Sequence, residues 1–320
     1  MDNKYSRQII FNKIGRKGQE KIRKASIAIV GLGALGTVAA EQLTRAGIGK
    51  LILIDRDFIE ESNLQRQALY NEEDIGKFKA ETAAKKLEKI NSDVKIDFFV
   101  SDLNHKNISK LLFADIILDC TDNFYTRYLI NDYCKKSRIK WVYSAAVKGY
   151  GNVMAVLPEK ACFRCVFNEA ESDETCDTAG IINTVSTAIA SIAVTQALKL
   201  ILNEKIEQEL IRFDIWDNDI TKIKVSKNEK CPVCNGIYEY LQGKKEKGIV
   251  IYCGNNNYQF YLKNKNFNEI KNKLKKIGKV KETDFCLFFE DMAIFNDGRV
   301  LIKEKSPERA KSLVSKYIGD

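Results

Sequence analysis

Short apolar runs alternate with longer amphipathic stretches along the first half of the chain. The runs are rich in isoleucine, leucine and valine, a pattern that predicts buried strands. They occupy residues 26–30, 51–54, 94–100, 114–120 and 140–146. The stretches with helical spacing are residues 13–24, 37–46, 75–90 and 123–136, with a short helix at 105–112. Strands that alternate with helices predict an α/β fold with a doubly wound, Rossmann-like, mainly parallel sheet.

The pattern changes from residue 210 onward. Paired strands are predicted at 210–217 and 219–225, and shorter strands at 248–252, 258–262, 285–289, 292–296 and 300–302. Two helices, at 268–277 and 307–317, accompany them. This organisation predicts a first domain at residues 1–240 and a small C-terminal α+β domain at residues 247–320.

A glycine turn links the first strand to the first long helix. Gly31, Gly33 and Gly36 follow the strand in a G-x-G-x-x-G pattern, and Asp55 ends the next strand about 20 residues further on. In such a turn the glycines allow a tight bend, a close approach of backbone N–H groups to phosphate and close helix packing, while the acid accepts from ribose hydroxyls. A nucleotide site is therefore predicted, although glycines at such a turn can also serve packing alone.

The loop after Asp55 is polar and carries an arginine and several amides. Arg66 offers a planar guanidinium that suits phosphate oxygens, and Asn63 and Gln67 can hold either the guanidinium or the phosphates. A solvated loop is the alternative interpretation.

Two Cys-x-x-Cys pairs lie far apart in the sequence. Cys162 and Cys165 form the first pair, and Cys231 and Cys234 the second. Together these two pairs, hereafter the hooks, supply the four thiolates of a tetrahedral Zn²⁺ site. The rival interpretation, a redox dithiol, needs only one pair. A structural zinc that staples the β extension of the fold is therefore predicted.

Composition narrows the class of protein. The chain has 320 residues and a formal net charge of +9, and from residue 241 onward 17 Lys and Arg stand against 10 Asp and Glu, a net charge of +7. Lysines scattered in this way are more typical of a solvated surface than of a groove that binds nucleic acid. The polar N-terminus, nine cysteines and an interrupted apolar stretch at 181–202 lead us to expect a cytoplasmic protein without a membrane span, with that stretch as a buried or dimer-interface helix.

Several motifs together resemble the ThiF/MoeB/HesA superfamily, the bacterial relatives of ubiquitin-activating enzymes. They are the glycine turn, Asp55-x-Asp57, the run Ser-Asn-Leu-Gln-Arg-Gln from Ser62 to Gln67, and the two cysteine hooks, and the resemblance spans residues 5–234. It implies adenylation of the C-terminal glycine of a ubiquitin-like sulfur-carrier protein that ends in Gly-Gly, with ATP, Mg²⁺ and Zn²⁺. It also implies a homodimer.

The resemblance assigns further site residues. Arg7 would reach the nucleotide of the other subunit, Lys79 would contact ATP phosphates in preference to the nearby Lys77, and Asp122 would hold Mg²⁺. From the sequence alone Asp122 could equally cap the helix that follows it. The resemblance also places nucleotide contacts at Ala34, Asp57, Ser62 and Asn123. Ala34 departs from the second consecutive glycine of many relatives, and we expect the site to survive that change.

Cys176 lies in an acidic segment between the hooks, where thiazole-biosynthesis members of the family carry a cysteine that can bond to the carrier protein. A surface thiol without a function is the alternative, since adenylation needs no enzyme nucleophile. The resemblance is greatest to the thiazole-biosynthesis adenylyltransferases. It implies a cysteine desulfurase as the sulfur donor. Molybdopterin-type carrier activation is the first alternative, and a nicotinamide oxidoreductase or a non-catalytic family member are more distant ones.

Overall fold

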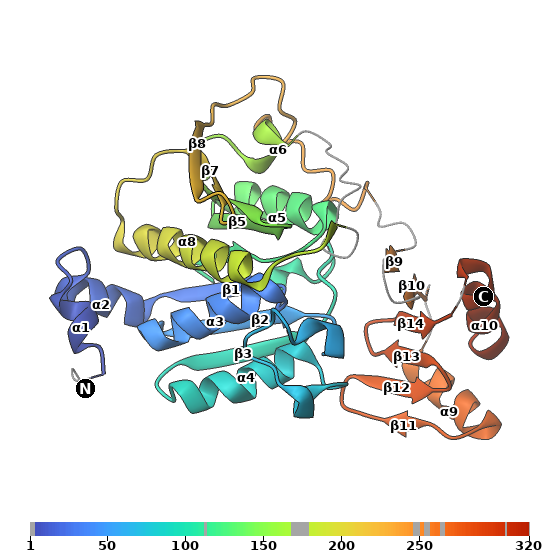
Figure 1. Ribbon diagram of the computed structural model, residues 1–320. Coiled ribbons are helices and arrows are strands. Elements are labelled where there is room, and N and C mark those ends of the chain that lie inside the picture. The colour runs from blue at the N-terminus through green and yellow to red at the C-terminus, as the bar shows by residue number, and fades with distance from the viewer. Residues whose placement is uncertain are drawn as a thin grey trace. The chain divides into compact units, whose positions relative to one another are not determined.

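The structure is a computed structural model and describes residues 4–111, 114–167, 179–245, 250–252, 257–262, 266–304 and 306–319. The chain divides into two compact units, Met1–Lys245 and Glu246–Asp320. Figure 1 shows the helices and strands of both units. The division into domains at residues 1–240 and 247–320 stays a prediction.

An eight-stranded sheet organises the first unit, in the order β3-β2-β1-β4-β5-β6-β7-β8. The first five strands in sequence run parallel to one another: β1 (Ser26–Val30), β2 (Lys50–Asp55), β3 (Lys95–Val100), β4 (Ile116–Asp119) and β5 (Lys140–Val147). The last three add antiparallel: β6 (Tyr150–Val156), β7 (Glu209–Asp214) and β8 (Asp219–Lys224). The predicted doubly wound, mainly parallel sheet is thereby confirmed.

Helices cover both faces of this sheet. The side chains of each strand alternate between the two faces, so each face has apolar side chains that pack against helices. In β1, Ile27 and Ile29 join a core that includes side chains of α2 (Gly15–Lys24), α3 (Ala34–Ala46), α4 (Lys79–Ile90) and α8 (Asn183–Leu202). Ala28 and Val30 join a second core with α5 (Phe124–Ser137) and the short α6 (Phe163–Val166). The short α1 (Ser6–Ile10) precedes α2.

Two predicted helices are four residues shorter in the structure. The helix expected from residue 75 begins at Lys79, because Asn71 and Asp74 cap each other around a separate 3₁₀ turn, η2 (Glu72–Asp74). The helix expected at 105–112 is reduced to the 3₁₀ turn η3 (Ile108–Leu111). There, Asn107 accepts from the backbone N–H of Asn104 and donates to the carbonyl of Asp102, and such local bonds compete with helix formation.

Helix α8 is the one described helix that is long and apolar enough to cross a membrane, by length and composition only. Half of its most apolar window is buried within the protein, and it packs on α3, β5 and β6. A core helix of a globular protein passes the same test, and this packing agrees with the buried helix expected from the sequence.

The second unit is a small α+β structure, as predicted. Its sheet has the order β11-β12-β13-β14-β10-β9 and is antiparallel. The strands are β9 (Val250–Tyr252), β10 (Asn257–Tyr261), β11 (Lys281–Glu282), β12 (Cys286–Phe289), β13 (Met292–Phe295) and β14 (Arg299–Lys303). Helices α9 (Phe267–Ile277) and α10 (Pro307–Tyr317) contribute Leu274 and Val314 to its core.

Candidate active site

The carboxyl ends of β1, β2 and β4 form one edge of the sheet, hereafter the rim. The strand order reverses between β1 and β4, and ligands of doubly wound sheets bind at such a switch point. The glycine turn follows β1, Asp55 ends β2, and Asp122 follows β4. The topology therefore brings three separately predicted elements to one place.

Two glycines of the turn are required by packing. Gly31 has φ +88°, and a Cβ there would lie 2.7 Å from the carbonyl oxygen of Cys120. A Cβ on Gly36 would lie 1.9 Å from the carbonyl oxygen of Gly31, so only glycine lets α3 approach the turn this closely.

Gly33 differs, because the nearest atom to its Cβ position is Nε2 of Gln67, at an ordinary contact distance of 3.7 Å. Gly33 is the N-cap of α3 and has no side chain with which to cap the helix, while Ala34 is the first helical residue. The N-terminal amides of this helix are therefore left to a ligand or to water, an arrangement that suits an anion.

Asp55 holds the turn in place. Its Oδ2 accepts from the backbone N–H of Leu32 at 2.6 Å, and its Oδ1 accepts from the N–H of Asp57 at 2.7 Å. Burial raises the pKa of the Asp55 carboxyl, although the Lys79 ammonium acts in the opposite direction. Each oxygen keeps acceptor capacity beyond its backbone bond, so the predicted ribose contact is compatible with this geometry.

Lys79 opens α4 at the same rim and is buried. Its Nζ lies 3.8 Å from Oδ2 of Asp57, a long ion pair that leaves most of its donor capacity unused. Tyr70, which the sequence did not single out, links this helix to the turn: its hydroxyl lies 3.0 Å from the carbonyl oxygen of Leu32 and 3.2 Å from that of Lys79. Lys77, by contrast, pairs with Asp74 at 3.2 Å.

The loop with Arg66 is fixed by its amides. Oδ1 of Asn63 accepts from the backbone N–H of Glu60 at 3.1 Å, and Nη1 of Arg66 donates to the carbonyl of Ser62 at 2.9 Å. Gln67 is buried against the glycine turn, and its Oε1 has no hydrogen-bond partner among the described residues. A buried amide oxygen without a partner beside the turn is expected where a ligand completes the site.

Asp122 does not cap α5, which removes the alternative left open by the sequence. Asn123 is the cap: its Oδ1 accepts from the N–H of Thr126 at 2.9 Å, and its Nδ2 lies 3.3 Å from Oδ1 of Asp122. The Asp122 side chain is exposed.

The pKa of the Asp122 carboxyl lies below its ordinary value. Desolvation by the surrounding atoms would raise it, but the charge of Arg56, the hydrogen bond from Asn123 and the charge of Arg127 outweigh that effect. An exposed, ionised carboxylate at the rim is a suitable ligand for a hard cation.

Sequence reasoning missed a set of buried and half-buried charges next to the rim. Arg56 donates to Oδ1 of Asp102 at 3.1 Å, and Arg127 lies 3.7 Å from the buried Asp119. Arg56 follows Asp55 directly, and Asp119 ends β4. Their positions at the ends of strands were the only signal in the sequence that these charges lie near the rim.

The described structure does not bring Arg7 to the rim of its own chain. Arg7 lies in α1, which follows Tyr5, and the Tyr5 ring packs on Gly47 at the C-terminal end of α3. Helix α3 has 13 residues and is therefore about 20 Å long, with the glycine turn at its other end. Within this chain, Arg7 and the turn are thus separated by the length of a helix.

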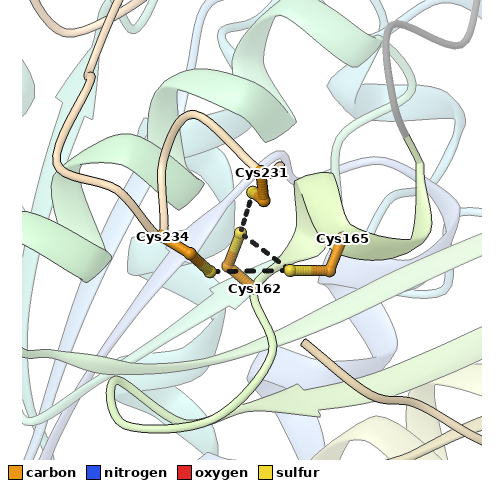
Figure 2. Close-up of side chains that lie close together, drawn as sticks. All are labelled: Cys162, Cys165, Cys231 and Cys234. Atoms are coloured by element: carbon orange, nitrogen blue, oxygen red, sulfur yellow. Dashed lines mark hydrogen bonds between the residues drawn. The ribbon is translucent and has the colours of Figure 1, made fainter. Parts of the chain in front are cut away.

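The four hook cysteines converge on one point (Figure 2). All their sulfurs lie within 4.8 Å of one another, and the Cys162–Cys231 and Cys165–Cys234 pairs are each 3.5 Å apart. Tetrahedral zinc with Zn–S bonds of about 2.3 Å places neighbouring sulfurs about 3.8 Å apart. The cluster therefore fits a metal site.

This cluster lies away from the rim in the sheet topology. Strand β6 ends opposite Trp141, where β5 begins, and β8 ends opposite Glu209, where β7 begins. Both strands that precede the hooks thus end at the sheet edge opposite the rim, which indicates a structural role for the cluster. Cys176 lies outside the described residues.

Comparison with known proteins finds a family, similar sequences and similar structures. The model of the ThiF family matches residues 5–233. The chain is 38% identical to the "Sulfur carrier protein ThiS adenylyltransferase" of Bacillus subtilis (strain 168) over 336 aligned positions, which cover 100% of both chains. It is 34% identical to the protein of the same name from Escherichia coli (strain K12), over 73% of this chain and 95% of that one.

A crystal structure of Escherichia coli MccB with MccA-N7isoASN superposes with a TM-score of 0.66 at 25% identity, over 73% of this chain and 75% of that chain. The Bacillus protein matches the full length, so the C-terminal unit is shared with it, whereas the family model ends before that unit.

Proposed function

The chain belongs to the ThiF family, and on that premise we propose that it uses ATP to adenylate the C-terminal glycine of a ubiquitin-like sulfur-carrier protein. The observation that carries the proposal is the full-length match to a protein named for adenylation of the carrier ThiS. The rim supports it, because the glycine turn, Asp55, Lys79 and Asp122 are assembled there from separate segments.

In the proposed reaction, a carboxylate oxygen of the carrier's last glycine attacks the α-phosphorus of ATP. The bond from that phosphorus to the bridging oxygen breaks, pyrophosphate leaves, and the carrier becomes an acyl-adenylate. Asp55 accepts from ribose hydroxyls, and the amides at the start of α3 face phosphate, with Ala34, Asn63, Gln67 and Asn123 lining the nucleotide. Lys79 and Arg66 offset the charge of the triphosphate, which is the main task of catalysis in such a transfer.

Mg²⁺ fits this donor set, because Asp122 is exposed and its pKa is held low, and Asp57 is a second carboxylate at the rim. Bound there, the ion would neutralise phosphate charge. Zn²⁺ fits the cysteine cluster by donor type and sulfur spacing, and it would link the segments after β6 and β8.

The position of Arg7 leads us to propose a homodimer. Because it lies at the far end of α3 from the glycine turn of its own chain, we propose that it serves the nucleotide site of the partner subunit. Exposed Ile10 and Phe11 lie beside it and supply apolar surface for that contact.

For the pathway we propose thiamine thiazole synthesis, with a cysteine desulfurase as sulfur donor and Cys176 as a candidate for a covalent link to the carrier. Carrier activation for molybdopterin synthesis is the alternative.

The test is ATP–pyrophosphate exchange with purified enzyme, Mg²⁺ and candidate carriers that end in Gly-Gly. The matched control is the same carrier with its C-terminal carboxylate amidated. Exchange with the free carboxylate, absent with the amide and in Asp122→Ala, supports the proposal. ATP binding without exchange for any thiamine- or molybdopterin-type carrier would reject it.

A further inference from the structure

The residue before Asp122 has every one of its hydrogen-bonding groups engaged by two buried side chains. Oδ1 of Asp119 accepts from the backbone N–H of Thr121 at 2.9 Å and from its hydroxyl at 2.6 Å. Nη2 of Arg127 donates to the carbonyl of Thr121 at 2.6 Å. The N–H, hydroxyl and carbonyl groups of Thr121 are thus all held by hydrogen bonds to Asp119 and Arg127.

Both members of this pair are themselves fixed in the interior. The Asp119 side chain is completely buried at the end of β4, and its backbone carbonyl accepts from the hydroxyl of Ser144 on β5 at 2.6 Å. The guanidinium of Arg127 lies 5.2 Å from the ring centre of Phe124 and 5.3 Å from that of Tyr143.

The pair is poorly built for stability. Nε of Arg127 and Oδ2 of Asp119 are 3.7 Å apart, and neither atom has a hydrogen-bond partner among the described residues. A buried ion pair with such geometry recovers little of its desolvation cost. The hydrogen bonds of the Asp119–Arg127 pair to Thr121 explain its presence better than a net gain in stability does.

Direct contact of Arg127 with a phosphate does not suit this geometry. Its side chain is only 8% exposed, lies against two rings and donates to Thr121. Asp122, one residue on from Thr121, is by contrast exposed, and Asn123 on its other side is fixed as the cap of α5. An exposed carboxylate is therefore flanked by two immobilised residues.

We propose that Arg127 and Asp119 are positioning residues, which fix Thr121 and so hold the Asp122 carboxylate in the place where it binds the cation of the nucleotide. The inference rests on the proposed function for the role of Asp122 and names the residues that prepare it. Removing a residue that orients a metal ligand commonly lowers metal affinity by about 10–100-fold.

The test is calorimetric titration with ATP, with and without Mg²⁺, on the full chain. The measured quantity is the factor by which Mg²⁺ tightens ATP binding. In Arg127→Met that factor is expected to fall by about tenfold or more, while the affinity for ATP without Mg²⁺ is retained. Arg127→Lys keeps the charge and should restore part of the factor.

Arg299→Lys is the matched control. Arg299 is also a buried arginine, with Nε 3.9 Å from an aspartate oxygen and its guanidinium 3.7 Å from a phenylalanine ring centre, but it belongs to the second unit. We expect it to leave the magnesium factor unchanged, whatever it does to thermal stability.

Thr121→Val keeps the side-chain shape and removes only the hydroxyl donor, so it serves if Arg127→Met does not fold. A reduced factor in it supports the proposal. Unchanged magnesium factors in Arg127→Met or Thr121→Val would overturn the proposal, as would a wild-type protein in which Mg²⁺ does not tighten ATP binding. Absence of carrier-dependent exchange, with the magnesium factor behaving as expected, would reject the proposed function alone.

Discussion

The same substitution at two glycines of one turn should lower stability by unequal amounts, with the larger loss at Gly36. In Gly36→Ala the new methyl carbon would lie 1.9 Å from the Gly31 carbonyl oxygen, so turn and helix must separate by about 1 Å. Overpacking of this kind costs about 3 kcal/mol, of which the better helix propensity of alanine offsets about 1 kcal/mol. The net loss of about 2 kcal/mol corresponds to a fall in Tm of about 4–8 °C for a unit of this size.

Gly33→Ala is the matched change. Its methyl would meet nothing closer than 3.7 Å and its φ is not positive, so the loss of stability should stay below about 1 kcal/mol. The methyl would stand where phosphate approaches the start of α3, and we expect ATP to bind about tenfold more weakly, a change of about 1.4 kcal/mol.

The assay is thermal unfolding of both variants beside the wild type, followed by calorimetric titration with ATP. A Gly36→Ala protein with the wild-type Tm would refute the packing argument. A Gly33→Ala protein with wild-type ATP affinity would refute the placement of phosphate at this turn.

Three further predictions concern other parts of the molecule. Purified protein should contain one zinc per chain by elemental analysis and lose it, with a lower Tm, in Cys231→Ser; a metal-free wild-type protein with an intact fold would contradict this. Burial raises the pKa of Asp132 to about 7. Between the ordinary pKa of an aspartate and about 7, the folded state therefore binds more protons than the unfolded state. The free energy of unfolding should fall as pH rises through that window. Asp132→Asn should flatten this slope in denaturant titrations, and an unchanged slope would assign it to other groups. Cys176→Ser should keep ATP–pyrophosphate exchange within about twofold, because adenylation needs no enzyme nucleophile, whereas a large loss would place Cys176 in the adenylation step.

The sequence predicted the strands of the parallel sheet well, because runs such as Ser26–Val30 are buried on both faces and have no polar interruption. It also predicted which segments meet at the rim, since parallel strands end at one edge. The family resemblance, now confirmed, is the source of the roles proposed for Arg7 and Lys79.

Other features depend on contacts that local patterns do not contain. Helix α4 starts late because Asn71 and Asp74 bond to each other, and α5 is capped by Asn123 rather than Asp122. The Asp119–Arg127 pair escaped notice because an aspartate at the end of a strand and an arginine within a helix are ordinary until their contacts with Thr121 are seen.

Intact-mass spectrometry of the carrier tests the central claim most directly. The carrier is incubated with enzyme, ATP and Mg²⁺ together with pyrophosphatase, which prevents reversal. We predict that a carrier with a free Gly-Gly terminus gains the mass of one adenylyl group, and that the amidated carrier and the Asp122→Ala enzyme give no gain. An unchanged carrier mass with an enzyme that binds ATP, or an equal gain on the amidated carrier, would contradict the account.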